Sequence, residues 1–462
     1  MDMDTPVGML AAAAEQGADI PGYQAWVFAA ILVVTLALMA AEKVHKTLLA
    51  LLAGGGCLLL GDLWGYFAHD ADHHLPPYIR MIEWEVTGIV IGATVFVEIA
   101  ARSGVFTWVS IKMLKASRGD PFRLLIFFSI LTAIFSAFLD NITAMIIIGS
   151  LTVVACRKLS LDPKPFLITE GIMTNVGGLL TLISSIPNII IGKAADISYL
   201  DFVIVTGPYT CLATVATLLV ARARFGETVS SIRDPEERAQ NLALVQAFDE
   251  WETVKDRRFF YTSIVAIILV ILGFALRSHI PVLKDFGIEV VAMGAAVIMM
   301  LLHAKDVEED LSHVEWSLVF FFVGLFTLIG VLEKAHVLEH IGRLLAGLTD
   351  VTGNVGLMWC TAVFSSVTDN IPLAAMVGKI FGPTPEVARA LPATQWWAVV
   401  FGANLGGNIT PIGSASTVVA VTIMKKNDVK ITFIEFVKIG ALFAAVQLVL
   451  ASGYLFVLRA IL

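Results

Sequence analysis

Long apolar runs recur along the chain, with short polar stretches between them. A run of about 20 apolar residues is long enough for one helix to cross the hydrocarbon core of a bilayer. Runs of this kind predict spanning helices at 23–41, 48–66, 84–101, 202–220, 259–276, 287–302, 316–332 and 433–457. The pattern therefore predicts an all-α polytopic membrane protein.

The apolar segment at 124–156 is too long for one ordinary span, and basic residues stand directly at both of its ends. Because Lys and Arg mark the cytoplasmic side of a membrane, both ends are expected on the same side. The segment therefore predicts a re-entrant helical hairpin whose tip lies at 139–141. A second hairpin is predicted at 355–380.

Two other apolar segments carry helix-breaking residues in their interior. The segment at 166–192 is interrupted by the glycine pair Gly177-Gly178 and by Pro187, and the segment at 397–424 has a matching glycine pair. Non-helical backbone at membrane depth is tolerated where it is buried or lines a cavity. We therefore expect two broken helices beside a cavity.

The two halves of the chain carry the same motifs in the same order. An offset of 229 residues relates Asp140-Asn141 to Asp369-Asn370, Asn175-Val176-Gly177-Gly178 to Asn404-Leu405-Gly406-Gly407, and Thr181 to Thr410. Because each half is expected to cross the membrane an odd number of times, the second half has the opposite orientation in the membrane. We predict two inverted repeats, each with five spanning helices (one broken) and one re-entrant hairpin. This architecture is typical of secondary transporters, whose site lies at the repeat interface.

Loop charges predict the domains and their sides of the membrane. Residues 1–22 contain acidic but no basic residues, so they are not a typical secretory signal. The stretch at 222–258 holds seven Lys and Arg residues, which indicates a cytoplasmic linker. We expect an extracytoplasmic tail at 1–22, repeat 1 at 23–221, the linker at 222–258 and repeat 2 at 259–462. Both termini are then outside, in a membrane that we take to be a bacterial inner membrane.

Composition narrows the function classes. Only 15% of residues are charged and 57% are hydrophobic, against roughly 25% charged in a soluble protein. This excludes a soluble enzyme and a disordered chain, and the net charge of −8 excludes a nucleic-acid binder. The four cysteines are far apart, and the histidines at 69–74 (His69, His73 and His74) fit a solvated loop better than a metal site. No cofactor is expected beyond bound Na⁺ or H⁺.

The hairpin tips and the broken helices together offer carboxylates, amides, backbone carbonyls and helix N-termini. Oxygen ligands suit a hard cation such as Na⁺, and helix N-termini suit an anion, so the predicted substrate is a small inorganic ion. The candidate substrate or ion residues are Asp140, Asn141, Asn175, Gly177, Gly178, Thr181, Asp369, Asn370, Asn404, Gly406, Gly407 and Thr410. Of these, Asn141, Asn175, Asn370 and Asn404 are the candidate Na⁺ ligands. Ser185, Asn188, Asn408 and Ser414 form a second rank.

Each of these assignments has a purely structural alternative. Asp140 and Asp369 could serve only as helix caps, and the asparagines could only hold broken backbone together. Glu170 is the candidate for proton coupling, because it is acidic at membrane depth and its repeat counterpart is Val399. Its alternative is a buried carboxylate satisfied by neighbouring hydroxyl groups. Glu98, with Arg102 four residues on, fits a plain helical ion pair.

Two strings resemble signatures of a known family. The string "SAFLDNITAMIIIGSLTVVACRKLSLDPKPFLITEGIMTNVGGLLTLISSIPNIIIG" and the second-half strings "SSVTDNIPLAA" and "FGANLGGNITPIGSASTVVA" resemble those of the arsenite permease and sodium–proton antiporter family of the ion transporter superfamily. Within this family, the strings resemble the branch of the pink-eyed dilution protein. The resemblance implies an elevator-type transporter of small inorganic ions or oxyanions, often coupled to protons, and elevator-type relatives are often homodimers. Relatives often have Gly-Asp-Pro-Pro-Asn where this chain has Ser-Ser-Ile-Pro-Asn at 184–188, so one acidic group is missing here.

Three functions remain open. The first is a proton-coupled antiporter that exports Na⁺ or arsenite or antimonite, which the acidic tips favour. The second is a Na⁺-coupled importer of an anion such as a dicarboxylate, sulfate or silicate. The third is a structural membrane protein, which would not need the site residues that this chain retains. The expected partners are the small ion and the lipid bilayer, without nucleic acid, and a homodimer is an open expectation.

Overall fold

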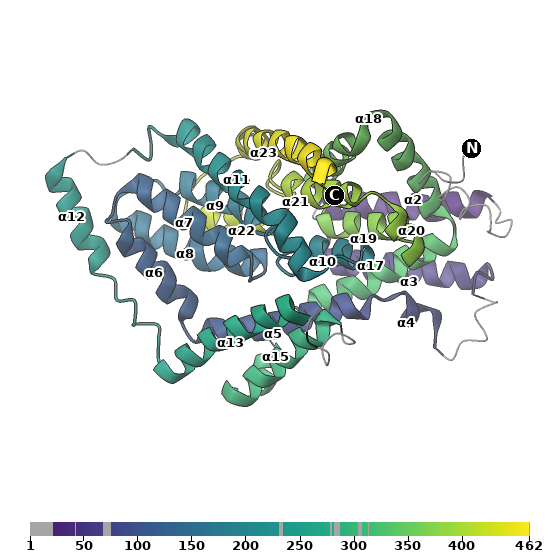
Figure 1. Cartoon of the computed structure of the whole chain (residues 1–462), viewed down its shortest axis with the longest axis horizontal. Coiled ribbons are helices and arrows are strands. Elements are labelled where there is room, and N and C mark those ends of the chain that lie inside the picture. Colours follow the sequence, from purple (N-terminus) through teal and green to yellow (C-terminus); the bar gives the residue numbers. More distant parts are fainter. Residues whose placement is uncertain are drawn as a thin grey trace.

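The computed structural model describes residues 22–41, 43–67, 75–230, 234–277, 280, 287–303, 307–312 and 314–461. Every regular element within these ranges is a helix (Figure 1). The predicted tail, apart from its last residue, and the histidine cluster at 69–74 lie outside the described residues.

The first half has helices in every apolar run where they are predicted, and two further helices, α4 and α6, lie outside these runs. They are α2 (Gly22–Ala40), α3 (Lys46–Leu63), α4 (Pro77–Met81), α5 (Trp84–Arg102), α6 (Val105–Ala116), α7 (Pro121–Ser136), α8 (Asn141–Lys158), α9 (Lys164–Gly177), α10 (Ile186–Ala194) and α11 (Tyr199–Phe225). The pair α7 and α8 is the first hairpin, and α9 and α10 are the two parts of the first broken helix.

The second half repeats this order after the linker helix α12 (Pro235–Gln246). It contains α13 (Arg257–Leu276), α15 (Ile288–His303), α16 (Val307–Ser312), α17 (Trp316–Lys334), α18 (Val337–Val367), α19 (Asn370–Phe381), α20 (Pro385–Ala390), α21 (Ala393–Gly406), α22 (Ala415–Lys426) and α23 (Phe433–Ile461). Gly353 divides α18 at φ 67°, a conformation that favours glycine. The second hairpin therefore consists of 354–367 and α19.

Among the described residues, eight helices are long and apolar enough to cross a membrane, by length and composition: α2, α3, α5, α8, α11, α13, α17 and α23. Both hairpins and both broken helices occupy the predicted segments. The prediction of an all-α polytopic membrane protein with two repeats is therefore confirmed. The domain boundaries and the sides of the membrane on which the loops lie stay predictions.

The spanning helices separate into two packed groups. The frame group, which we define as α2, α3, α5, α13, α15 and α17, contains the repeat-related pairs α3 with α17 and α5 with α15. The hairpin group, which we define as α7 to α10, the 354–367 part of α18, α19, α21 and α22, contains both hairpins and both broken helices. Figure 1 shows the first hairpin beside α9 and α22, at the end of the molecule away from α19. Thus the inverted repeats interlock rather than fold as separate domains.

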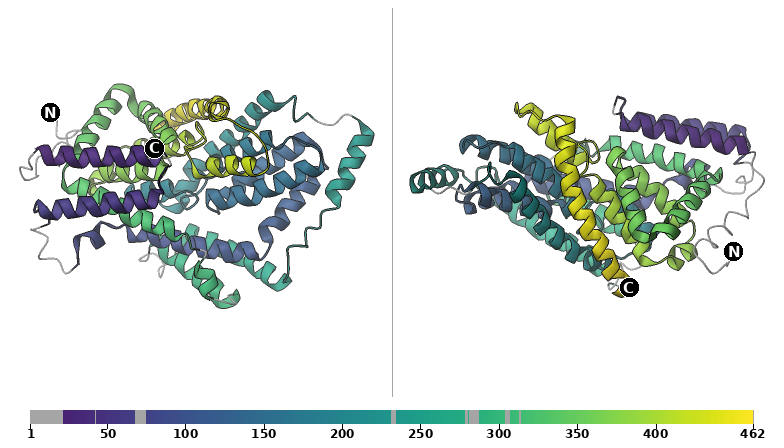
Figure 2. Two further views of the ribbon diagram at one scale, coloured as in Figure 1. Left: turned by 180° about the vertical axis from the view of Figure 1, so that it is seen from behind. Right: turned by 90° about the horizontal axis from the view of Figure 1, so that it is seen from above.

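The last helix of each repeat crosses the centre of the molecule. α11 packs against α23, and Figure 2 shows α23 running diagonally past both halves of the hairpin group. Tyr209 on α11 donates a hydrogen bond to the carbonyl of Gln447 on α23 at 2.8 Å, and Tyr454 donates to the carbonyl of Val205 at 2.7 Å. These contacts position α23 beside the broken helices.

The linker packs against the base of the first hairpin. Glu250 pairs with Lys112 at 2.5 Å and with Lys115, both on α6, and these lysines hold the pKa of Glu250 well below its usual range. The Lys158 ammonium at the end of α8 lies 4.0 Å from the ring centroid of Phe248. The linker contains one helix, α12.

Candidate functional site

The aspartate on each hairpin tip caps the helix that follows it. The Asp140 side chain accepts hydrogen bonds from the backbone N–H groups of Ile142 and Thr143, both at 2.9 Å. The repeat-related Asp369 accepts from Ile371 N–H at 3.2 Å. Capping satisfies donors at the helix start that have no partner within the helix. The capping role of both residues is therefore confirmed, whereas contact with a substrate stays a prediction.

The second tip also contacts the frame group. Lys46 at the start of α3 pairs with Asp369 at 2.6 Å, and its ammonium lies 5.3 Å from the centroid of the Phe321 ring. No sequence pattern links Lys46 to a residue 323 positions away. The pair gives the second tip a positive neighbour. Asp140 on the first tip has an exposed side chain.

The glycines of both broken helices allow the hairpins to approach closely. A Cβ atom on Gly177 would lie 2.3 Å from the carbonyl oxygen of Ala133, and one on Gly406 would lie 2.3 Å from that of Ala362. Real Cβ contacts are never this short, so only glycine fits at these two positions. The second glycines, Gly178 and Gly407, leave slightly more room, with Asn141 Oδ1 3.1 Å from the Cβ position of Gly178.

Hydrogen bonds between hairpin and broken helix repeat with the same offset. Ser136 donates to the carbonyl of Thr174 at 2.6 Å, and Ser365 donates to that of Ala403 at 2.6 Å. A second pair behaves in the same way. The Thr181 hydroxyl donates to the carbonyl of Ala137 at 2.6 Å, and the Thr410 hydroxyl donates to the carbonyl of Ser366 at 2.5 Å. The two predicted threonines therefore fix the breaks to the tips.

A row of amide groups connects the first tip to the second broken helix. Asn141 donates to Asn175 Oδ1 at 3.3 Å. Asn175 in turn donates to Asn408 at 2.8 Å and to Ser414 at 2.9 Å. Asn175 and Asn408 are completely buried. The structure thus brings together four residues that the sequence predicts, from both repeats.

The reciprocal contact runs from the second broken helix to the first. Asn404 donates to Asn188 Oδ1 at 2.8 Å, and Asn188 donates to the carbonyl of Gly178 at 2.7 Å. Asn404 Oδ1 is buried and accepts no hydrogen bond from any residue in the described ranges. A buried carbonyl oxygen without a donor costs free energy. It is therefore a candidate ligand atom for a cation or a hydroxyl group.

Gln447 and Thr217, which the sequence did not indicate, complete this network. Asn408 donates to Gln447 Oε1 at 2.9 Å, and Gln447 donates to Thr217 at 2.9 Å. Gln447 is 1% exposed. A polar residue in the middle of the last apolar run is the signal that could have identified it.

Glu170 lies apart from the amide row, one and a half turns earlier on α9. Its side chain is completely buried, and Thr152 on α8 donates to its Oε1 at 2.6 Å. Within the part of the chain that the structure describes, its Oε2 has no hydrogen-bond partner. A neighbouring hydroxyl group therefore satisfies one of the two carboxyl oxygens, and proton coupling at Glu170 stays a prediction.

The remaining predicted residues occupy less connected positions. Asn370 on the second tip is half-buried, and Ser185 stands at the N-cap position of α10. Its repeat counterpart Ser414, already named in the amide row, also caps α22 through Thr417 N–H at 3.3 Å. Glu98 pairs with Arg102 at 3.5 Å, as expected for a helical ion pair.

The comparisons with known proteins agree with this architecture. The family model described as "Citrate transporter" matches residues 36–402. An uncharacterized transporter of Mycobacterium bovis is 31% identical over 92% of this chain and 96% of its own length. The human P protein is 28% identical over 94% of this chain, which corresponds to 60% of the P protein.

A solved structure supports the fold. The crystal structure of the YdaH transporter of Alcanivorax borkumensis, described as having an unusual topology, superposes with a TM-score of 0.60 over 90% of this chain and 99% of that chain. At 14% identity this likeness supports the fold alone. The P protein is the pink-eyed dilution protein, so the sequence match confirms the predicted resemblance to its branch. The chain belongs to the citrate transporter family of the ion transporter superfamily, and it is an integral membrane transport protein rather than an enzyme.

Proposed function

We propose that the protein is a secondary active transporter that exchanges protons for a small inorganic ion, with Na⁺ and arsenite or antimonite as the candidate substrates. The hairpin group carries the site and moves against the frame group in an elevator-type cycle. The observation that carries the proposal is Glu170, a fully buried carboxyl group with one unpartnered oxygen inside the hairpin group.

The surroundings of Glu170 support a proton-carrying role. An ionised carboxylate that is buried without a cationic partner costs several kcal/mol. Thr152 supplies one hydrogen bond, which offsets only part of that cost. Glu170 therefore favours the neutral, protonated form in this arrangement, and it would release its proton where the cycle exposes it to water.

The buried amide row supports a small substrate. Asn175, Asn188, Asn404 and Asn408 bring neutral oxygen and nitrogen atoms to the place where both helices break. Amide and backbone oxygens are suitable ligands for Na⁺, and the same groups could hydrogen-bond the hydroxyls of arsenous acid. The unpartnered Asn404 Oδ1 is the first contact that we assign to the substrate.

A Na⁺-coupled importer of a carboxylate anion is the second candidate. The description of the matching family as a citrate transporter favours it. So does Lys46 beside the second tip, together with the helix N-termini at both tips, since both are favourable neighbours for an anion. In this case the amide row would hold the coupling Na⁺ and the tips would hold the anion.

Purified protein in liposomes with an imposed pH gradient separates the candidates. We expect Na⁺, Li⁺ or arsenite to dissipate the gradient when added to wild-type vesicles. If none of these moves protons while citrate accumulates under a Na⁺ gradient, the importer is correct and proton exchange is wrong. If neither gradient drives any of these solutes, both functions are wrong.

A further inference from the structure

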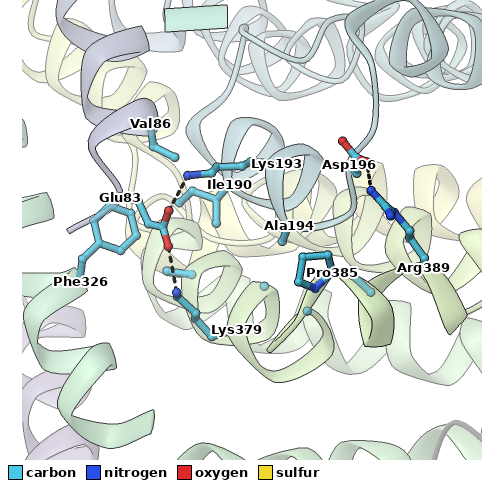
Figure 3. A pocket seen from close by; sticks show the side chains of 14 residues that line it. Glu83, Val86, Ile190, Lys193, Ala194, Asp196, Phe326, Lys379, Pro385 and Arg389 are labelled. Carbon is cyan, nitrogen blue, oxygen red and sulfur yellow. Dashed lines mark hydrogen bonds and ion pairs between the residues drawn. The ribbon is translucent and has the colours of Figure 1, made fainter. Parts of the chain in front are cut away.

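A cavity of about 340 Å³ lies between the frame group and the hairpin group, away from the amide row. Figure 3 shows Glu83, Val86 and Phe326 on one side and Lys193, Ala194 and Lys379 on the other. Glu83 and Val86 belong to the start of α5 and Phe326 to α17. Lys193 ends α10, and Lys379 lies near the end of α19. The cavity is therefore a boundary between the two groups.

One carboxylate of the frame group pairs with two cations of the hairpin group. Glu83 contacts Lys193 at 2.6 Å through one oxygen and Lys379 at 2.9 Å through the other. The side chain of Glu83 is 24% exposed, and those of the lysines are 35% and 32% exposed. Partial burial weakens screening by salt compared with a fully exposed pair.

Further carboxylates of the frame group surround the same two lysines. Glu85 on α5 lies 3.1 Å from Lys193, and Glu333 on α17 lies 3.9 Å from Lys379. At this boundary all of these carboxylates belong to the frame group and both lysines belong to the hairpin group. A sliding motion of one group along the other would separate these charges.

The inverted repeat provides an internal comparison. Glu315, before Trp316, is the counterpart of Glu83, before Trp84. At the repeat offset of 229, the positions of Lys193 and Lys379 correspond to Thr422 and Ser150. The mirrored place in the molecule therefore lacks the two lysines.

The two repeat-related glutamates differ in electrostatic surroundings as a result. Burial raises the pKa of Glu83, but Lys379 and Lys193 outweigh it and hold the pKa below the ordinary value. Burial raises the pKa of Glu315, Asp140 adds to this, and Lys46 opposes it. Two lysines meet Glu83 across the boundary, whereas a different ion pair, Lys46 with Asp369, crosses the boundary near Glu315.

We propose that Glu83, Lys193 and Lys379 form an electrostatic latch that holds the hairpin group in the arrangement seen here and thereby favours one of the two end states of the cycle. An interaction made in only one state shifts the equilibrium toward that state by its full free energy. The inference rests on the proposed elevator-type function. The latch changes the populations of the two end states and makes no contact with the amide row.

Electron–electron distance measurements on the full chain test the latch. Leu301 on α15 of the frame group and Val363 on α18 of the hairpin group are replaced by cysteine and spin-labelled. Their side chains are 82% and 61% exposed. Cys211 and Cys360, the exposed cysteines, are changed to Ser. Wild-type protein should give one dominant distance. Glu83→Gln should increase the ratio of a second distance to the first by about threefold to tenfold, as expected for loss of a partly buried ion pair. Lys193→Met should act in the same direction.

The chain offers a matched control. Asp196 pairs with Arg389 at 3.2 Å on the rim of the same cavity, but both residues follow hairpin-group helices and both are exposed. Asp196→Asn should leave the distances unchanged. If Glu83→Gln leaves the distances unchanged while Na⁺, arsenite or citrate produces a second distance in the wild type, the latch is wrong. The motion of the hairpin group is then still supported. If no variant and no added solute produces a second distance, the elevator motion is wrong and the latch with it.

Discussion

Replacing Glu170 by Gln should abolish proton-driven transport while leaving solute exchange intact. Gln keeps the size of the side chain and the acceptor for Thr152, which donates to Glu170 at 2.6 Å, but it cannot bind and release a proton. A transporter without its proton carrier can still bring a substrate to either side. In liposomes, the transport rate driven by a pH gradient should fall by roughly tenfold or more, as expected when the ionisable group at membrane depth is the coupling site.

Exchange of labelled against unlabelled substrate across the same vesicles should stay close to the wild-type rate, because no net proton movement is needed. Glu98→Gln is the control, since Glu98 is half-buried and pairs with Arg102 on its own helix. This variant should transport like the wild type. Gradient-driven transport by Glu170→Gln at the wild-type rate would show that the proton is carried elsewhere.

Placing a single methyl group at the hairpin contact should destabilise the protein strongly. In Gly177→Ala and in Gly406→Ala, the new Cβ would lie 2.3 Å from a backbone carbonyl oxygen of the hairpin. The backbone must move because no side chain there can yield, and overpacking of this kind costs about 1–3 kcal/mol. The apparent unfolding temperature, followed by tryptophan fluorescence in detergent, should fall by several degrees in both variants.

Gly55→Ala tests whether the position or the residue type matters. Gly55 lies on α3, and nothing lies within 4 Å of its Cβ position. Alanine is favoured over glycine in a helix by about 1 kcal/mol, so this variant should match or exceed wild-type stability. Equal unfolding temperatures for wild type, Gly177→Ala and Gly406→Ala would contradict the close packing of hairpin on broken helix.

Hydropathy and self-similarity were enough to predict the architecture. The hairpins, the breaks and the offset of 229 all come from local pattern, since helix-breaking residues and apolar runs act on the backbone near them. The repeat then predicts contacts as well. The bonds of Thr181 and Thr410 to the hairpin of their own repeat are related by the same offset.

Contacts between positions that are far apart in the chain and not related by the repeat could not be predicted from the sequence. Lys46 reads as a cytoplasmic loop charge, yet it pairs with Asp369. Gln447 sits in an apolar run and gives no hint that Asn408 is its partner. Partners of this kind depend on which helices pack together, and helix pairing is not encoded in periodicity. The same limit applies to Glu83 and its two lysines.

The tip aspartates show a different limit. The motif Asp-Asn predicts both a helix cap and an ion ligand, because both roles use a carboxylate at the start of a helix. The structure assigns the cap through the hydrogen bonds of Asp140 and Asp369. Whether these carboxylates also meet a substrate depends on the bound state, which a sequence pattern does not describe.

We expect the substrate or its coupling ion to bind between the two broken helices, at Asn404. The direct measurement is ligand-dependent thermal stabilisation, with NaCl titrated against choline chloride, and with arsenite and citrate titrated separately. Binding to the native state raises the unfolding temperature in a saturable manner. We expect such a rise for wild type and for the control Asn427→Ala, at the end of α22. For Asn404→Ala we expect a midpoint concentration at least about tenfold higher, equivalent to roughly 1.4 kcal/mol of binding free energy. A midpoint for Asn404→Ala equal to that of wild type would show that the ligand binds elsewhere.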